Sequence, residues 1–252
     1  MKTKVYEVIT FSFEMLFYLV FAILSIMFIW SSISNIIFSE RVKEFIDSAE
    51  YECEENNIIY YTVEDGNLDE DTITKKPSEN NIHFSPVLGA PGDIFLMPQS
   101  RMEYIPFFSS FVTYLFGGHA GVISNDEKII ESMGGSEEEG YVFLNDTDLF
   151  SEERTVIGLR VNASQEDRKK ALNSALGLVG RRYNYWFILN TKDKYYCMDI
   201  CSRIYDKEFN LDYNLDRNGF HTTINDLLFS KDTKISFVKY KYNGKTYIYY
   251  LK

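Results

Sequence analysis

An uncharged run from Met15 to Ser39 restricts the folding of this chain more than any other feature. The run is mostly apolar and about 25 residues long, which is enough for one helix to cross a bilayer. A cleaved signal peptide and a buried core helix are the alternatives. A signal peptide would have a shorter apolar region and a clear small-x-small cleavage site. We therefore predict an N-terminal tail at 1–14 and an uncleaved transmembrane helix at 15–39.

The charges on either side of this run give a weak orientation signal. Lys2, Lys4 and the amino terminus precede the run, and Arg41 and Lys43 follow it. The positive-inside count is nearly a tie. We favour a single-pass membrane protein with its N-terminus inside and the rest of the chain on the extracytoplasmic side.

Composition narrows the classes of partner and cofactor. A formal net charge of -11 argues against a nucleic-acid partner, because phosphate backbones are bound by clustered Lys and Arg. The three cysteines, Cys53, Cys197 and Cys201, form no Cys-x-x-Cys pair and are too few for a disulfide framework. We therefore predict no structural metal. No cofactor is predicted either, because the thiol chemistry considered below needs none.

The rest of the chain divides into a polar segment and a compact domain. Residues 40–85 are acidic and turn-rich, which is typical of a linker, with a short helix at its start. Residues 86–252 contain strand patterns such as 93–97, a helix predicted between Ser164 and Gly180, and a hairpin around Asn243-Gly244. Hairpins and helices in separate blocks predict an α+β domain with an antiparallel sheet packed with helices.

The stretch KYYCMDICSRIY, residues 194–205, predicts a short helix that begins near Cys197. Ile200, Ile204 and Tyr205 recur at three-to-four-residue spacing and form one apolar face. A thiol at a helix N-terminus lies at the positive end of the macrodipole, which stabilises the thiolate. The alternative is that Cys197 is a buried packing residue, since free cysteines are often buried.

A thiolate nucleophile needs a proton carrier, and His119 is the best placed of the three histidines. It begins a strand-like stretch, GHAGVIS, with small neighbours that leave the ring accessible. A turn at 125–127 joins this strand to KIIESMG, so His119 should face Glu131 directly or one diagonal step away. The Cys197 thiol would then be the nucleophile, the imidazole the base and the carboxylate the group that orients the base. The backbone N–H of Cys197 would be available to an oxyanion. The alternatives are a turn-filling histidine and a surface carboxylate.

The order of seven motifs resembles that of a known enzyme group. These motifs are GDI, GGHAGVI, KIIESMGG, VIGLRV, VGRRYNYWF, YYCMDICSRIY and TTINDLL. Over 89–230 the chain resembles the permuted papain-like amidases of the YaeF/YiiX type. These belong to a circularly permuted branch of the NlpC-like cysteine hydrolase superfamily, in which the His strand precedes the Cys helix. The resemblance implies a papain-like fold, with Cys197, His119 and Glu131 as the catalytic residues.

The same resemblance extends to the substrate site. It implies that Tyr183, in a Gly-x-x-Tyr context, lines the site, and we also assign Tyr196 and Gly118 to substrate binding. This chain departs from the family where Met198-Asp199 follows the nucleophile in place of Ser-Glu. It also departs where Gly118 precedes the histidine in place of Ser. His83 and His221 match no family position and are treated as ordinary polar residues.

The resemblance implies a membrane-anchored hydrolase that cleaves an amide or ester through a thioacyl intermediate. Its substrate would be a cell-wall peptide, another amide or an acyl lipid. One alternative is a catalytically inactive domain that binds a lipid or peptide at the membrane. The other is an acyltransferase like lecithin:retinol acyltransferase, although the Asn-Cys-Glu-His run of that group is missing here.

Overall fold

The structure is a computed structural model of the 252-residue chain. It describes residues 2–64, 89–98, 118–124, 128–134, 140–146, 154–187, 191, 193–216 and 221–251. The chain forms two compact units, Met1–Arg41 and Val42–Lys252, and each is considered by itself.

The N-terminal helix α1 runs from Lys2 to Asp47 and is 46 residues long. Across the helical residues that the structure describes, no segment is both long enough and apolar enough to cross a membrane. The predicted transmembrane helix at 15–39 and the predicted single-pass membrane location are therefore wrong. The prediction treated the apolar run as one element, but the helix begins in the charged tail before the run and continues into the charged residues after it.

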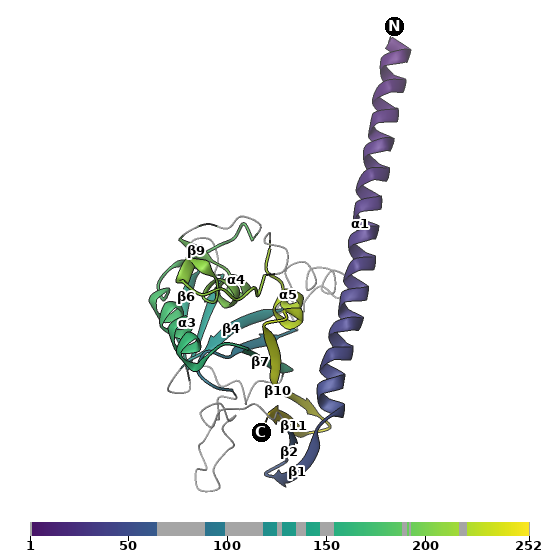
Figure 1. The fold of residues 1–252 in the computed structure, drawn as a ribbon. Coiled ribbons are helices and arrows are strands. Elements are labelled where there is room, and N and C mark those ends of the chain that lie inside the picture. Colours follow the sequence, from purple (N-terminus) through teal and green to yellow (C-terminus); the bar gives the residue numbers. More distant parts are fainter. Residues whose placement is uncertain are drawn as a thin grey trace. The chain divides into compact units, whose positions relative to one another are not determined.

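The second unit is built on one 11-stranded sheet within the described residues, in the order β1-β2-β11-β10-β7-β3-β4-β5-β6-β8-β9. Figure 1 labels several of these strands. In chain order the strands are β1 Glu50–Glu55, β2 Ile58–Val63, β3 Ile94–Met97, β4 His119–Ile123, β5 Ile129–Met133, β6 Tyr141–Asn145, β7 Val156–Val161, β8 Arg182–Tyr183, β9 Lys194–Tyr195, β10 Thr233–Tyr242 and β11 Lys245–Leu251.

The sheet is mixed, so the predicted antiparallel α+β sheet packed with helices is wrong. β2 pairs with β11 in parallel, and β8 pairs with β9 in parallel, while the other pairs are antiparallel. The first parallel pair arises because a hairpin from early in the chain attaches to the last strand. Pairing between such distant segments leaves no local signal in the sequence.

That early hairpin, β1–β2, lies inside the segment 40–85 that the sequence predicted as an acidic linker. Asn56 and Asn57 form its turn with φ of 51° and 65°, the left-handed conformation that tight hairpin turns require. Acidic side chains of β1 bond to β11: Tyr250 Oη donates to Glu52 at 2.5 Å and Lys245 Nζ to Glu54 at 2.6 Å. Acidic residues of this segment therefore lie on a strand, β1, and bond to side chains of β11.

The second unit has few helices, and they are short. They are α3 Gln165–Gly177, α4 Cys197–Arg203, the 3-10 turn η2 Lys207–Phe209 and α5 Ile224–Phe229. The predicted cap of α3 is confirmed, because Ser164 Oγ accepts from Asp167 N at 3.1 Å, although α3 ends three residues before Gly180. The predicted start of the α4 helix near Cys197 is also confirmed. α4 packs against β4 and β5, and α5 packs against β10.

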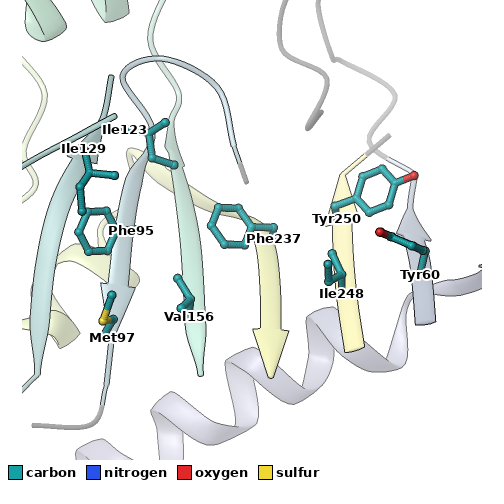
Figure 2. Close-up of a cluster of buried hydrophobic side chains, with 9 residues drawn as sticks. All are labelled: Tyr60, Phe95, Met97, Ile123, Ile129, Val156, Phe237, Ile248 and Tyr250. Carbon is teal, nitrogen blue, oxygen red and sulfur yellow. The ribbon is translucent and has the colours of Figure 1, made fainter. Parts of the chain in front are cut away.

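Buried apolar side chains from seven neighbouring strands hold the sheet together (Figure 2). The cluster comprises Tyr60, Phe95, Met97, Ile123, Ile129, Val156, Phe237, Ile248 and Tyr250. Phe237 lies opposite Gly158, where a Cβ atom would come within 2.1 Å of the Phe237 ring. The ring therefore fills the space that the glycine leaves, and the cluster fixes β3, β4 and β5 in place.

A buried ion pair joins the start of β3 to β7. Arg160 Nε donates to Asp93 Oδ1 at 3.0 Å and Arg160 Nη2 to Asp93 Oδ2 at 2.8 Å. Asp93 also accepts from the backbone N–H of Ala90 at 3.0 Å. The Asp93 and Arg160 side chains are 0% and 2% exposed, so each charge depends on the other for compensation.

Replacing Asp93→Ala should lower the free energy of unfolding by about 3–5 kcal/mol, because Arg160 would remain charged and buried without its partner. Urea denaturation measures this change. Lys207→Ala is the control, since it removes a pair with Asp212 in which both side chains are about 80% exposed. Equal unfolding midpoints for the two variants would contradict the expectation.

Candidate active site

Strands β4 and β5 place a histidine beside a buried carboxylate. Their antiparallel register pairs Gly121 with Glu131, so His119, two residues earlier on the same face, lies one diagonal step from Glu131. His119 Nε2 is hydrogen-bonded to Glu131 Oε2. The diagonal contact expected from the sequence is therefore present, while the turn at 125–127 lies outside the described residues.

Gly121 keeps this diagonal contact open. A Cβ at position 121 would lie 2.5 Å from the Phe95 ring and 2.7 Å from the carbonyl oxygen of Ile130. The Phe95 ring occupies that space and contacts the His119 ring, with centroids 5.9 Å apart and planes at 60°. The missing side chain thus lets an aromatic ring support the imidazole.

Glu131 is 2% exposed and has a hydrogen-bond partner at each carboxylate oxygen. Oε2 faces His119, and Oε1 accepts from Asn145 Nδ2 at 2.5 Å. The sequence analysis missed Asn145. Extending the hairpin register by one strand would have found it, because Asn145 on β6 pairs with Ile129 and so lies diagonal to Glu131.

Cys197 is the first residue of α4 and is buried against β4 and β5. Its Sγ lies 3.7 Å from Met198 Sδ, and the thiol also acts on the His119 ring, whose pKa it raises. Ser132, next to Glu131 on β5, donates to the carbonyl oxygen of Tyr195 at 2.6 Å and so fixes the residues just before α4. The structure therefore brings Cys197, His119 and Glu131 together from three separate elements.

The surroundings of His119 favour its protonated form. Burial alone lowers the pKa of His119, but the interactions of the imidazole with Cys197 and Glu131 outweigh that effect. Together they raise the pKa of His119 from 6.5 to about 9. The imidazole therefore carries a proton at neutral pH, between a sulfur and a carboxylate.

The two tyrosines assigned to substrate binding lie on different elements: Tyr183 is on β8, and Tyr196 directly precedes Cys197. Burial, followed by the charge of Cys197, raises the pKa of Tyr183. Tyr196 is buried, and its Oη accepts from Thr222 N at 2.7 Å and lies 3.2 Å from Thr222 O as a donor. Tyr196 therefore anchors the segment before α5, and a role in substrate binding stays a prediction for both residues.

Gly118, the third residue assigned to substrate binding, has a backbone role. Its φ is 84°, and a Cβ there would lie 2.3 Å from Ile224 Cδ1 and 2.4 Å from the carbonyl oxygen of Met97. A side chain therefore meets both backbone strain and a steric conflict. This explains why glycine stands where the resemblance leads one to expect serine.

His221, to which the sequence analysis gave no role, belongs to an aromatic cluster next to the nucleophile helix. Its ring stacks on Tyr196 with centroids 5.3 Å apart, and its Nδ1 is hydrogen-bonded to the carbonyl oxygen of Phe187 at 3.0 Å. Phe187 in turn contacts Tyr183 and Tyr196. The cluster joins the segment before α5 to β8, while His83 lies outside the described residues.

A buried arginine at the end of α4, Arg203, holds this helix in place. Arg203 Nη1 donates to Asp199 at 3.3 Å, its guanidinium pairs with Glu208 at 2.7 Å, and it lies 4.2 Å above the Tyr195 ring. Burial raises the pKa of Asp199 to about 7, and the charge of Arg203 opposes that increase. Asp199 thus serves the structure of α4 through Arg203.

Among the residues that the structure describes, no group of three or more His, Cys, Asp or Glu is placed to hold a metal ion.

Comparisons with known proteins give one loose similarity. No family model and no curated protein matches the chain. A solved structure that matches is the "Crystal structure of metalloprotein yiiX from Escherichia coli O157:H7, DUF1105", with 16% identity and a TM-score of 0.43. The match covers 60% of this chain and 98% of that chain. It does not distinguish a permuted NlpC-type fold from other arrangements.

Replacing Gly118→Ser should lower the free energy of unfolding by at least about 2 kcal/mol, because it adds strain at positive φ and a conflict with Met97 O. Urea denaturation measures the loss. Gly177→Ser is the matched control, since a Cβ at Gly177 meets nothing within 4 Å. A Gly118→Ser chain as stable as the Gly177→Ser chain would show that position 118 tolerates a side chain.

The His119 imidazole should titrate with a midpoint near pH 9 in an NMR titration of its Cε1–H signal. Cys197→Ala should lower that midpoint because it removes the interaction with the thiol that raises the pKa of His119, whereas Cys53→Ala should leave it unchanged. The folded pKa is higher than the unfolded value of 6.5, so the stabilisation is complete below pH 6.5 and is lost as pH rises through 9. A wild-type midpoint near 6.5 would refute this account of the site.

Proposed function

We propose that this chain is a cysteine hydrolase that cleaves an amide or ester bond. Cys197 is the nucleophile, His119 the proton carrier and Glu131 the residue that orients the imidazole. One observation carries the proposal: His119 Nε2 is hydrogen-bonded to a buried Glu131, and the Cys197 thiol on α4 acts on the same imidazole. A nucleophile beside a base, with the base bonded to an orienting carboxylate, is the arrangement that acyl-transfer chemistry requires.

The protonation of His119 supports this assignment of roles. An imidazole with its pKa raised to about 9 is protonated at neutral pH and can give its proton to a leaving group. The ionised Glu131 offers its Oε2 to the imidazole and fixes which nitrogen faces the sulfur. A buried cation of this type is stable only because acidic groups lie on both sides of it.

In the acylation step, the Cys197 sulfur attacks the carbonyl carbon of the substrate. A C–S bond forms and the carbonyl electron pair moves onto oxygen, where the backbone N–H of Cys197 is the expected donor. The oxyanion then collapses, the C–N or C–O bond breaks, and His119 transfers its proton to the departing amine or alcohol.

In the deacylation step, water attacks the thioester carbon while His119 accepts a proton from that water. The C–S bond breaks, the acid product leaves, and the Cys197 sulfur recovers its electron pair beside the protonated imidazole. The cycle consumes one water and releases one acid and one amine or alcohol, so atoms and charges balance without a cofactor in any step.

The full-length chain should turn over members of a panel of p-nitrophenyl esters and amino-acid p-nitroanilides. Cys197→Ala should lower the rate at least about a thousandfold, because it removes the nucleophile. His119→Ala should lower it by about a hundredfold to ten-thousandfold, the usual contribution of a general acid and base. Absorbance of the released nitrophenol or nitroaniline measures both rates.

Mass spectrometry of the quenched reaction should show an acyl adduct on the peptide that contains Cys197. Cys53→Ala is the control, since Cys53 lies on β1 in a different part of the sheet and its removal should leave rate and adduct unchanged. Turnover that survives Cys197→Ala, or an adduct on another cysteine, would refute the proposed nucleophile. Inertness of the wild-type chain toward every ester and amide would favour a binding domain.

A further inference from the structure

We propose that Asn145 is a positioning residue for this catalytic group, holding the Glu131 carboxylate ionised and turned toward His119. The inference rests on the proposed function and deepens it, because it adds a fourth residue to the Cys197, His119 and Glu131 chain.

The Asn145 amide lies against the Glu131 carboxylate. Its Nδ2 lies 2.5 Å from Glu131 Oε1, while the other carboxylate oxygen, Oε2, faces His119. An ionised carboxylate only accepts hydrogen bonds, so the amide must present its nitrogen and not its oxygen. With one donor at each oxygen, the carboxylate plane is fixed between Asn145 and His119.

The burial of Glu131 makes the amide important. The Glu131 side chain is 2% exposed, and an ionised carboxylate so far from water needs hydrogen bonds to stay charged. Asn145 is a neutral donor, so it stabilises the negative charge without competing with His119 as a second cation would. This preserves the pairing of Glu131 with the imidazole.

The sheet register fixes where the amide can reach. Asn145 is the last residue of β6 and pairs with Ile129, and Glu131 pairs with Phe143, so Asn145 and Glu131 are diagonal neighbours on one face. His119 reaches Glu131 by the matching diagonal from β4. Three consecutive strands, β4, β5 and β6, therefore each contribute one member of a polar row that ends at Cys197.

Among the described residues, the titratable groups that act on this row come from three elements. Cys197 on α4 and Glu131 on β5 act on His119. Cys197 in turn acts on Tyr183 on β8 and on Cys201 on α4. Asn145 contacts Glu131, and a change at Asn145 should reach the sulfur through Glu131 and His119.

Two variants test the inference in the full-length chain. Asn145→Asp is nearly isosteric but replaces the donor with a second carboxylate, and Asn145→Ala removes the donor. Both should raise the titration midpoint of the Glu131 carboxyl carbon in ¹³C NMR, with Asp raising it more because two carboxylates then share the site. Both should also lower the alkylation rate of Cys197 by iodoacetamide at pH 7 about tenfold and move the acid limb of its pH profile upward.

Asn162→Ala is the matched control, since the Asn162 amide bonds to Lys231 O on the surface and is exposed. It should leave the Glu131 midpoint and the Cys197 profile unchanged. A merely structural Asn145 would lower the free energy of unfolding in urea and leave both midpoint and profile in place, which would overturn the inference.

The readouts separate this inference from the proposed function. In one outcome, Cys197 of the wild-type chain is inert, and the Glu131 midpoint is highest in Asn145→Asp, lower in Asn145→Ala and lowest in the wild-type chain. The positioning role then stands and the hydrolase proposal fails. If Cys197 is reactive and neither Asn145 variant differs from Asn162→Ala in midpoint or profile, the hydrolase proposal stands and the positioning role fails.

Discussion

The pairing of Gly121 with Glu131 across β4 and β5 is the constraint on which the candidate site depends. It sets His119 one diagonal step from Glu131, and it leaves room over Gly121 for the Phe95 ring that contacts the imidazole. A shift of register by one residue would turn Glu131 to the opposite face of the sheet. The buried cluster that includes Phe95, Ile123 and Ile129 makes such a shift costly (Figure 2). The apolar core therefore holds the strands in the register that places His119 beside Glu131.

Features with a local physical cause were predictable from the sequence. The Ser164 hydroxyl caps α3 because an unpaired N–H lies three residues on, and Asn243 and Gly244 turn β10 into β11 because both adopt positive φ. The same holds for the start of α4 at Cys197 and for the diagonal contact between His119 and Glu131, which needs only a hairpin. In each case the residues involved lie within about a dozen positions of one another.

Features that depend on distant pairing were not predictable in this way. The parallel contact between β2 and β11 joins segments almost two hundred positions apart, and nothing in either strand indicates its partner. Asn145 was missed because its role appears only once β6 is paired with β5. The transmembrane prediction failed for another reason: it rested on the run at 15–39 taken from the sequence, and no helical segment among the described residues is long and apolar enough to cross a membrane.

The position of the site in a wide sheet follows from the cost of burying charge. His119 is protonated at neutral pH and Glu131 is 2% exposed, so both need partners that do not move. Adjacent strands supply such partners at fixed diagonal distances, and Ser132 ties the same strands to the residues before Cys197 through Tyr195 O. The Cys197 thiol lies on a separate short helix that packs against β4 and β5 and that Arg203 ties to Asp199, so it is held near the imidazole although the two residues are far apart in the sequence. The polar row of His119, Glu131 and Asn145 is therefore rigid, because its residues lie on adjacent paired strands. Loops would not hold these side chains at fixed distances.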